Sequence, residues 1–383
     1  MKKYGVLVAA VPLFCGCISA NAQSSVTLYG LIDNGIDYIS NVGGKSNVAM
    51  ESGDFTGSRW GIRGSEDLGT GLHAVFRLES GFNVNNGKLG QGGALFGRAA
   101  YVGLQHNDYG EIRMGRQYNA ATEAWAPYTA TFSTIGAFAD HPLDNDNSDG
   151  FYRSSNAAKY ISPQIGGFQF EASYAFSNST NFADNREYSF AGTYNYGSLS
   201  GVVAYTRVNN PSSATNPNGA IQPTTAFSFI GSSMQNIGAG LRWNFSNLSN
   251  LTLAYSHVDV YSTPDGTIGN VGYGVTLKGQ DAWKFDNVEL NGQYYISPAL
   301  SVAAAYTFTH AGVFALQSGS AVWHQGSLIL NYALSKRSSL YVMGAYQHAN
   351  RFAAAQFGAD IAGYGKSSSQ NQALARIAVL HKF

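Results

Sequence analysis

The sequence predicts an all-β fold, a closed antiparallel transmembrane β-barrel of about sixteen strands. Three observations predict it. Apolar and polar residues alternate with a period of two along most of the chain, the alternating runs are about ten residues long, and the connections between them are short and long in turn. A strand tilted by ~45° needs that length to cross the hydrocarbon of a bilayer.

The first 22 residues are expected to be a cleaved signal peptide, because a basic start is followed by an apolar run over 4–18 and then by small residues. A lipoprotein signal is the alternative. It needs small residues directly ahead of its cysteine, and 14–17 fits that poorly. Both cysteines of the chain lie in this segment. The remainder, 23–383, therefore has no thiol for a disulfide, a thiolate metal site or a nucleophile.

Composition excludes several classes of protein. Without the first 22 of 383 residues, 361 remain, with 21 basic and 23 acidic residues. Nucleic-acid binding calls for a marked basic excess, which this balance excludes. Charged residues are only 12 % of the chain, against ~25 % in soluble domains. No apolar run after the signal approaches the ~20 residues of a transmembrane helix, so an exported protein that crosses a membrane with strands is favoured.

The stretch 168–176 illustrates the alternation. One face reads Phe, Phe, Ala, Tyr, Phe, and the other reads Gln, Glu, Ser, Ala. Only a strand places successive side chains on opposite faces, so helix is excluded for such runs. The same pattern predicts further strands around 188–196, 199–205, 288–296, 300–308, 328–334 and 340–346.

The connections between strands differ at the two ends of the predicted barrel, as they do in bacterial outer-membrane barrels. Short turns are expected at 66–69, 107–110, 163–167, 197–198, 246–250, 297–299 and 335–339. Long polar loops are expected near 41–54, 83–95, 119–150, 177–186, 208–225, 259–282, 309–322 and 349–369. Seven turns and eight loops join sixteen strands into a single domain over 23–383.

A soluble β-sandwich is the alternative, since it also has period-two patterning, with its apolar face turned inward. The aromatic residues favour the barrel. Tyr and Phe lie at the ends of the apolar stripes, beside the turns, where interfacial girdles lie. The opposite stripe is polar, as a wet lumen requires, and sixteen strands leave a water-filled interior whereas about eight are filled by their own side chains.

Charged residues on the polar stripe are the candidate functional residues. The alternation turns Arg59 and Arg63 toward the lumen, and likewise Arg77 and Glu79. Rings and opposed rows of charge set the ion preference of a pore. The simpler interpretation is solvated lumen charge or, for Arg77 and Glu79, a pair across the wall.

From residue 25 onward the sequence resembles the general porins of β-proteobacteria, which are Gram-negative outer-membrane proteins. The order and spacing of several motifs carry the likeness, which covers the whole chain after the signal. The motifs are SVTLYGLID at 25–33, GSRWGIRGSEDLG at 57–69, RAAYVGL at 98–104, GRQ at 115–117 and RSSN at 153–156. The last strand ends in Phe383 after apolar residues at alternate positions, which is similar to the signal that directs barrel assembly.

The resemblance implies a water-filled homotrimer whose third loop, 119–150, folds into each lumen as a constriction. In such porins a cluster of wall arginines faces acids on this loop, and Arg59, Arg98 and Arg153 match the wall arginines. The acids available on the loop are Glu123, Asp140, Asp144, Asp146 and Asp149. The stretch 137–142 departs from the Pro-Glu-Phe-Gly-Gly of enterobacterial relatives, which leaves open the acid that faces the arginines.

Catalytic and metal-binding patterns are weak. The stretch 144–150 (DNDNSDG) is similar to a calcium loop, but its Gly falls at the seventh position instead of the sixth and a closing Glu is missing. A solvated acidic loop is therefore expected there. The eight histidines lack metal-site spacing, and His257, on a lipid-facing stripe, has no companion serine motif for an outer-membrane hydrolase. We expect no metal, no cofactor and no enzymatic activity.

The leading hypothesis is an outer-membrane channel for passive diffusion of ions and small hydrophilic solutes. Its expected partners are its own copies, for which Arg116 matches a subunit contact of the family, outer-membrane lipid and lipopolysaccharide, and the barrel-assembly machinery. A substrate-specific channel would carry an aromatic track, to which Tyr29, Tyr295 and Tyr341 could contribute without forming a run, and a plugged barrel is a further alternative. The sign of ion selectivity stays open, because the arginines favour anions and the loop acids favour cations.

Overall fold

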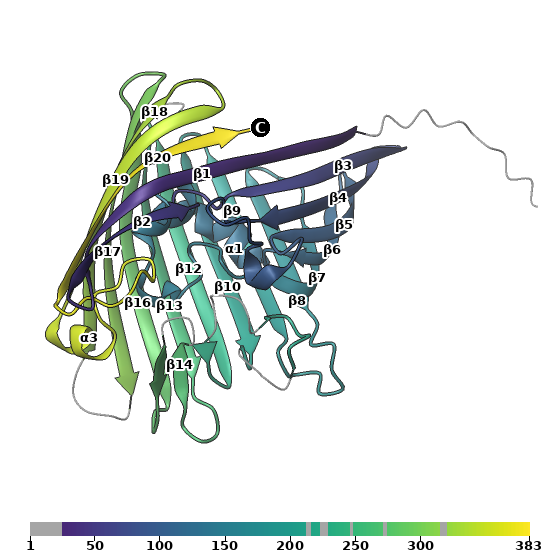
Figure 1. Ribbon diagram of the computed structural model, residues 1–383. Coiled ribbons are helices and arrows are strands. Elements are labelled where there is room, and N and C mark those ends of the chain that lie inside the picture. The colour runs from purple at the N-terminus through teal and green to yellow at the C-terminus, as the bar shows by residue number, and fades with distance from the viewer. Residues whose placement is uncertain (1–24, 212–215, 223–228, 246–247, 271–273, 315–319) are drawn as a thin grey trace, which may run out of the picture.

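The computed structural model describes residues 25–211, 216–222, 229–245, 248–270, 274–314 and 320–383. The predicted signal peptide lies outside these residues. The described chain forms one 17-stranded antiparallel sheet that curves into a barrel (Figure 1). Its strands are β1 (Ser25–Val42), β2 (Lys45–Ser52), β3 (Arg59–Gly69), β4 (Leu72–Gly81), β5 (Ala99–His106), β6 (Gly110–Gln117), β7 (Ser154–Ile161), β8 (Phe168–Ala175), β9 (Glu187–Tyr196), β10 (Leu199–Asn209), β12 (Ser233–Asn244), β13 (Asn250–Tyr261), β16 (Ala282–Tyr295), β17 (Leu300–Phe314), β18 (Ser320–Ala333), β19 (Ser338–Ala349) and β20 (Asn371–Lys382).

The first strand closes the barrel. Along one edge β1 pairs with β20, from Leu31 opposite Lys382 to Ile39 opposite Leu374. Along its other edge it pairs with β3 near its start and with β2 near its end, so β2 and β3 together occupy one position of the barrel. Counted this way, the described sheet has sixteen positions, which confirms the predicted fold class. Closure leaves no free edge, as a spanning sheet in lipid requires.

The apolar face of the sheet points outward, which excludes the sandwich. On β16, Val288 and Leu290 are 43 % and 50 % exposed, whereas the alternating Asn287 and Glu289 are fully buried. A sandwich would bury the aliphatic set and expose the polar one. The exposed aliphatic residues therefore form a lipid-facing surface, and the polar ones line the interior.

Short turns and long loops alternate as predicted, but some strands extend further than expected. The predicted loop 41–54 is mostly a hairpin, because β1 and β2 are joined by Gly43 and Gly44 alone, both in the left-handed region. Such a two-residue turn suits glycine, which pays no steric cost at positive φ. The predicted loop 309–322 is likewise largely strand, since β17 runs to Phe314 and β18 starts at Ser320.

Two outer loops carry a second, three-stranded sheet, and a third carries a helix. The small sheet consists of β11 (Phe229–Ile230), β14 (Ile268–Asn270) and β15 (Val275–Leu277). The helix is α3 (Arg351–Gln356), within the loop predicted at 349–369. Among the described residues, no helix is both long enough and apolar enough to cross a membrane.

Beneath these loops lies a buried aromatic cluster inside the barrel mouth. Trp283 and Phe285 of β16 and Trp323 of β18 pack around Phe357, with the rings of Trp283 and Phe357 stacked at 5.2 Å. The expectation of no lumen-facing aromatic run was wrong here, because these side chains alternate inward on strands that continue past the lipid. They are almost fully buried, so they form a core under the loops and not an open track.

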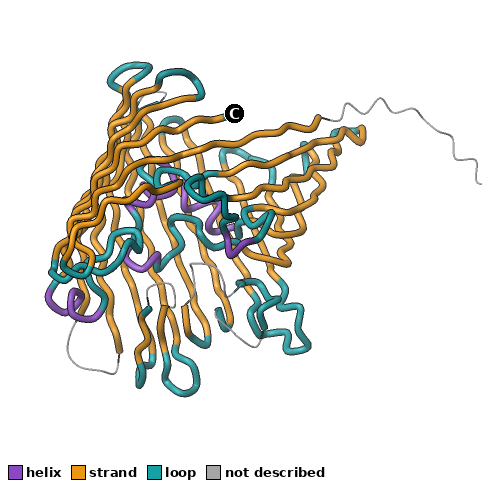
Figure 2. The backbone as a smooth tube through the Cα atoms, in the orientation of Figure 1, coloured by secondary structure: helices purple, strands orange, loops and turns teal. Residues whose placement is uncertain are grey.

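The third loop folds into the barrel, as predicted (Figure 2). It contains five short helical turns that lie within the ring of strands. They are α1 (Ala120–Trp125), η2 (Ala126–Tyr128), α2 (Ala130–Ser133), η3 (Ala137–Ala139) and η4 (Pro142–Asp144). This loop positions the candidate site.

Candidate functional site

The third loop begins with a helix whose N-terminus is anchored to the barrel wall. Asn119 caps α1 by accepting a hydrogen bond from the Thr122 amide at 2.7 Å. The amide of Ala121 donates to Ser189 Oγ of β9 at 2.8 Å, and the amide of Ala120 donates to Ser173 Oγ of β8 at 3.1 Å. The first amides of a helix have no partner within it, so wall hydroxyls on lumen positions supply the acceptors.

Two glycines on β12 let the loop lie flat on the wall. A Cβ at Gly238 would stand 2.7 Å from the ring of Trp125, and one at Gly240 would stand 2.8 Å from the ring of Tyr128. The indole of Trp125 donates to the Ala239 carbonyl at 3.1 Å, and the guanidinium of Arg242 covers Tyr128 at 4.9 Å. The missing side chains thus provide the space for two large aromatic rings.

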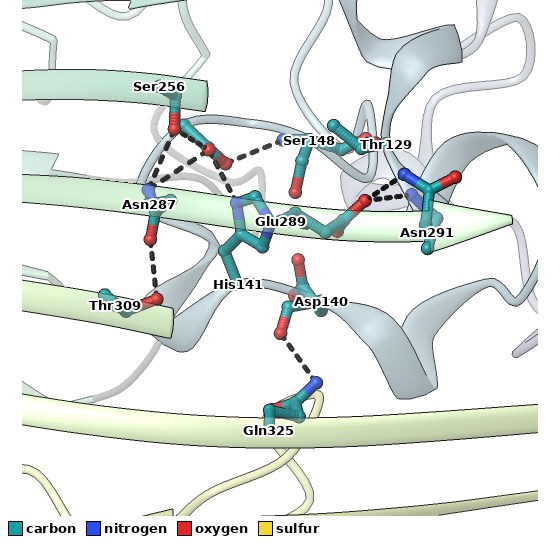
Figure 3. A network of polar contacts seen from close by, with 12 residues as sticks. Thr129, Asp140, His141, Ser148, Ser256, Asn287, Glu289, Asn291, Thr309 and Gln325 are labelled. Carbon is teal, nitrogen blue, oxygen red and sulfur yellow. Dashed lines mark hydrogen bonds and ion pairs between the residues drawn. The ribbon is translucent and has the colours of Figure 1, made fainter. Parts of the chain in front are cut away.

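A buried polar network fixes the middle of the loop (Figure 3). His141 contacts Asp146 Oδ2 through Nδ1 at 2.7 Å and Glu289 Oε2 of β16 through Nε2 at 3.1 Å. The other oxygen of Glu289 accepts from the Ala130 amide at 2.8 Å. Burial lowers the pKa of His141, but the two carboxylates outweigh burial and hold that pKa well above its usual range. A charged His141 therefore joins the loop to the wall.

The sequence pattern did not single out this network. His141 stood among scattered histidines, and its partner Glu289 is 148 residues away. One available signal was the run of lumen-facing polar residues at Asn287, Glu289 and Asn291 on a single strand. All three are fully or almost fully buried, and each is hydrogen-bonded to the third loop.

The opposite wall carries the predicted arginines. Arg98 donates to Glu79 Oε1 through Nε at 2.8 Å, and Arg59 donates to Gly57 O at 2.8 Å and to Thr56. Arg153 donates to Tyr118 OH at 2.6 Å and lies over its ring at 4.7 Å. Arg59, Arg98 and Arg153 interact electrostatically with one another, so the fold brings the three together although they come from different parts of the chain.

Three further lumen positions extend this group. Arg77 forms an ion pair with Glu79 and donates to Tyr29 OH at 2.7 Å, while that hydroxyl donates to Glu79 Oε2 at 2.7 Å. Arg63 lies over the Tyr29 ring at 5.4 Å. Arg77 and Glu79 thus form the pair that the simpler interpretation expected. We call Arg59, Arg63, Arg77, Arg98 and Arg153 the arginine patch. Among the described residues, Glu79 is the one carboxylate in ion pairs with it.

Glu123, the first acid of the loop, lies in a separate ionic cluster. It pairs with Arg113 of β6 at 3.0 Å and with Lys159 of β7, which also approaches Glu171 of β8. Burial raises the pKa of Glu123, but the two cations outweigh it and keep that pKa low. Glu111 also pairs with Arg113. Glu123 is therefore paired with cations of β6 and β7 and not with the arginine patch.

The remaining acids of the loop divide between two sites. Asp146 belongs to the His141 network, where it also accepts hydrogen bonds from Ser256 and Asn287. Asp140, Asp144 and Asp149 converge instead, with one oxygen of each within 4.8 Å of the others. Asp149 also interacts electrostatically with Arg153, which makes it the loop acid associated with the arginine patch.

The expectation of a solvated acidic loop at 144–150 was wrong. Asp144 and Asp146 are 6 % and 3 % exposed, and Ser148 is fully buried. The physical reason is that the loop lies inside the barrel, where β13 and β16 cover it. Burial raises the pKa of Asp140 and Asp144 well above the usual range and that of Asp149 to about 7.

A further ionic cluster locks the closing strands. Arg376 of β20 is fully buried and contacts Asp37 at 2.7 Å, Asp33 at 3.5 Å and Asp54 at 2.5 Å. The Asp54 carbonyl also accepts from the Ala137 amide at 2.6 Å, so the tip of the third loop is joined to this seam. No local sequence pattern indicates this cluster, because Arg376 lies more than 300 residues from its three acids.

Arg116, the predicted subunit contact, and Phe383, the predicted assembly signal, both form hydrogen bonds within the chain. Arg116, near the end of β6, donates to Gly97 O and to Ser155 Oγ, both at 2.7 Å, and so joins the segment before β5 to the start of β7. Phe383 exchanges two backbone hydrogen bonds of 3.0 Å with Gly30, next to which its ring lies. The C-terminal residue therefore completes the seam with β1.

Comparisons with known proteins agree with this geometry. A family model described as Gram-negative porin matches residues 6–351. The chain is 33 % identical over 379 residues to an outer membrane porin protein of Bordetella pertussis, which covers 90 % of this chain and 94 % of that relative. It is 32 % identical over 235 residues to outer membrane porin protein 32 of Delftia acidovorans, which covers 59 % of this chain and 62 % of that relative.

Solved structures share the fold at lower identity. The anion-selective porin from Comamonas acidovorans superposes with a TM-score of 0.69 at 22 % identity, over 94 % of this chain and 100 % of that one. The trimer form of OmpT from Vibrio cholerae superposes with a TM-score of 0.66 at 13 % identity, over 94 % and 99 %. At these identities the likeness establishes the barrel architecture.

Proposed function

This chain belongs to the Gram-negative porin family, which places it in the outer membrane as a passive diffusion channel, and we propose that its lumen favours small anions. The resemblance read from the sequence is thereby confirmed. The observation that carries the anion preference is the arginine patch, in which five arginines share one paired carboxylate, Glu79.

The preference follows from which charges are left uncompensated. Arg59 and Arg153 are held by carbonyl, hydroxyl and aromatic groups and form no ion pair within the described residues. Several other acids in the lumen have cationic partners of their own, among them Glu123 of the third loop with Lys159 and Asp37 with Arg376. A ring of uncompensated positive charge raises the local concentration of anions and lowers that of cations.

Transport of this kind needs neither a cofactor nor a catalytic group, because a concentration gradient or a membrane voltage supplies the driving force. His257 is the residue that an outer-membrane hydrolase would use. It contacts Asp286 at 2.8 Å and Asp259 at 3.5 Å on the outward face, an arrangement of interfacial polar residues. We infer that the protein is a channel and not an enzyme.

We also propose that the protein forms a homotrimer in outer-membrane lipid and lipopolysaccharide. The barrel-assembly machinery is proposed to recognise Phe383. The trimer form of a structural neighbour supports the assembly, and Arg116 is the candidate subunit contact. Arg59, Arg98 and Arg153 are the constriction residues of this proposal, and Arg63, Arg77 and Glu79 line the approach.

The test is single-channel recording from refolded protein in a planar bilayer, with the reversal potential measured under a KCl gradient. Conductance increments in groups of three are expected for an open trimer, and the reversal potential is expected to have the sign of chloride permeation. A folded barrel without conductance would favour the plugged alternative. A reversal potential of the opposite sign would overturn the assignment of the arginine patch.

A further inference from the structure

Three carboxylates on the third loop meet in a buried place that the channel function does not explain. Asp140 follows η3, Asp144 ends η4, and Asp149 precedes Arg153 at the end of the loop. One oxygen of each lies within 4.8 Å of the other two. Asp140 and Asp144 are 5 % and 6 % exposed, so water covers little of this charge.

Four of the six carboxylate oxygens have no hydrogen-bond partner in the described part of the protein, whereas Oδ1 of Asp149 accepts from the Phe151 amide at 2.6 Å. Both oxygens of Asp144, Oδ1 of Asp140 and Oδ2 of Asp149 are shielded from solvent and accept no hydrogen bond there. The neighbouring Asp146 shows the contrast, because His141, Ser256 and Asn287 all contact its carboxylate. A buried carboxylate without a partner is strongly destabilising, so three together require either protons or a cation.

We propose that Asp140, Asp144 and Asp149 bind one calcium ion. Calcium takes oxygen ligands at 2.3–2.6 Å, so oxygens on opposite sides of one ion stand roughly 4.6–5.2 Å apart. Magnesium, at about 2.0–2.1 Å, requires roughly 4.0–4.2 Å between opposite ligands and near-octahedral geometry. Three carboxylates that an irregular loop brings within 4.8 Å of one another suit the flexible coordination of calcium better than the octahedron that magnesium requires.

The proposed ligands differ from those of the calcium-loop pattern in the sequence. That pattern spans 144–150 and uses positions one, three and five, which would include Asp146. In the structure Asp146 points to His141, and Asp140, which precedes the pattern, takes its place. The site therefore arises from the fold of the loop inside the barrel.

An ion here would also act on the pore, an inference that rests on the proposed function. Asp149 interacts electrostatically with Arg153 of the arginine patch. Binding replaces the protons of these buried acids with a divalent cation, and it ties the loop at 140 to the loop at 149. Because this cluster lies next to Arg153, calcium is expected to change the anion preference of the channel.

The site is tested by equilibrium dialysis of refolded full-length protein in detergent against calcium alone, with magnesium in a parallel series. We expect one saturable calcium ion per chain, with a dissociation constant of about 0.1–1 mM, the range of extracellular calcium modules. Asp144→Asn is expected to weaken binding at least tenfold, with Asp140→Asn as a second variant. Asp265→Asn, in an exposed outer loop, is the control and is expected to bind as wild type does.

Two results would overturn the proposal. One is the absence of saturable binding up to about 10 mM calcium, far above the range of extracellular sites, which would mean that the acids carry protons. The other is binding that Asp144→Asn and Asp140→Asn both leave intact. The reversal potential is then compared in calcium and in EGTA, and a shift is expected in the wild type but not in Asp144→Asn. Binding without conductance would refute the channel and keep the site, whereas conductance without binding would refute the site alone.

Discussion

Replacing Arg59 with glutamine removes one uncompensated charge from the arginine patch. The side chain lies at the start of β3, is partly exposed to the lumen, and is held by Gly57 O and Thr56 Oγ1 without a carboxylate partner. Glutamine keeps a polar side chain that can still donate to these oxygens. The barrel is therefore expected to fold, and the change in ion preference reports on charge.

The magnitude follows from Coulomb's law with screening. A unit charge at about 5 Å from a passing ion contributes roughly 0.8 kcal/mol in water, and a Debye length of ~10 Å at 0.1 M salt reduces this to about 0.5 kcal/mol. That energy changes the local concentration of each ion about twofold. Because anions and cations change in opposite directions, the anion-to-cation permeability ratio is expected to fall about fivefold.

The assay is the reversal potential of single channels under a KCl gradient centred near 0.1 M. The matched control is Arg337→Gln, which removes the same charge from an exposed turn between β18 and β19. Its effect is expected to be much smaller, because the turn is far from the constriction. The reasoning fails if Arg59→Gln leaves the permeability ratio unchanged, or if Arg337→Gln changes it as much.

Three further predictions concern the anchoring of the third loop. Glu289→Ala leaves Nε2 of His141 and the Ala130 amide without a partner, and it is expected to lower the free energy of unfolding by about 3–5 kcal/mol in denaturant titrations. Asp286→Ala, on the outward face of the same strand, is expected to cost under ~1 kcal/mol, and equal losses would contradict the network. Gly238→Val is expected to displace Trp125 and change single-channel conductance, and Gly201→Val, where a Cβ meets nothing nearer than 3.7 Å, is expected to leave it unchanged. Because the pKa of His141 is raised, the stability that its charged form contributes is fully present below about pH 6.5 and is lost as pH rises through the raised value. The melting temperature is therefore expected to fall toward alkaline pH. If it falls no more steeply in the wild type than in His141→Gln, the imidazolium contributes nothing.

The strands could be predicted from the sequence because alternation is a local property of a wall between lipid and water. Val288 and Leu290 face one solvent and Glu289 the other, whatever the rest of the chain does. The alternation of apolar and polar residues is required only where a strand lies in the lipid. Beyond the membrane a strand needs no apolar face, so the polar residues at the end of β1 and in β2 have the pattern of a loop although they continue the ladder to Val42.

The lumen-facing position of the arginines could also be predicted. For Arg59 it follows from the alternation along its strand, and for Arg98 and Arg153 it follows from the resemblance to the family. The acids could not be assigned in the same way. Their partners depend on where a loop of about thirty residues comes to lie inside the barrel, and the pairs it makes, such as His141 with Glu289, join positions 148 residues apart. Local pattern holds no information about such distances.

The two sides of the lumen differ in how they can hold the third loop. On β12, Gly238 and Gly240 leave room for rings of the third loop, and the amides and carboxylates of β16 satisfy its backbone. The opposite wall offers guanidinium groups, which a loop could cover only by desolvating them or by pairing them with acids. Two acids of the loop pair with other cations, Glu123 with Lys159 and Asp146 with His141. Asp140 and Asp144 converge with Asp149, which also interacts electrostatically with Arg153. Anchoring the loop therefore pairs Glu123 and Asp146 away from the arginine patch, and this distribution of charge underlies the proposed preference for anions.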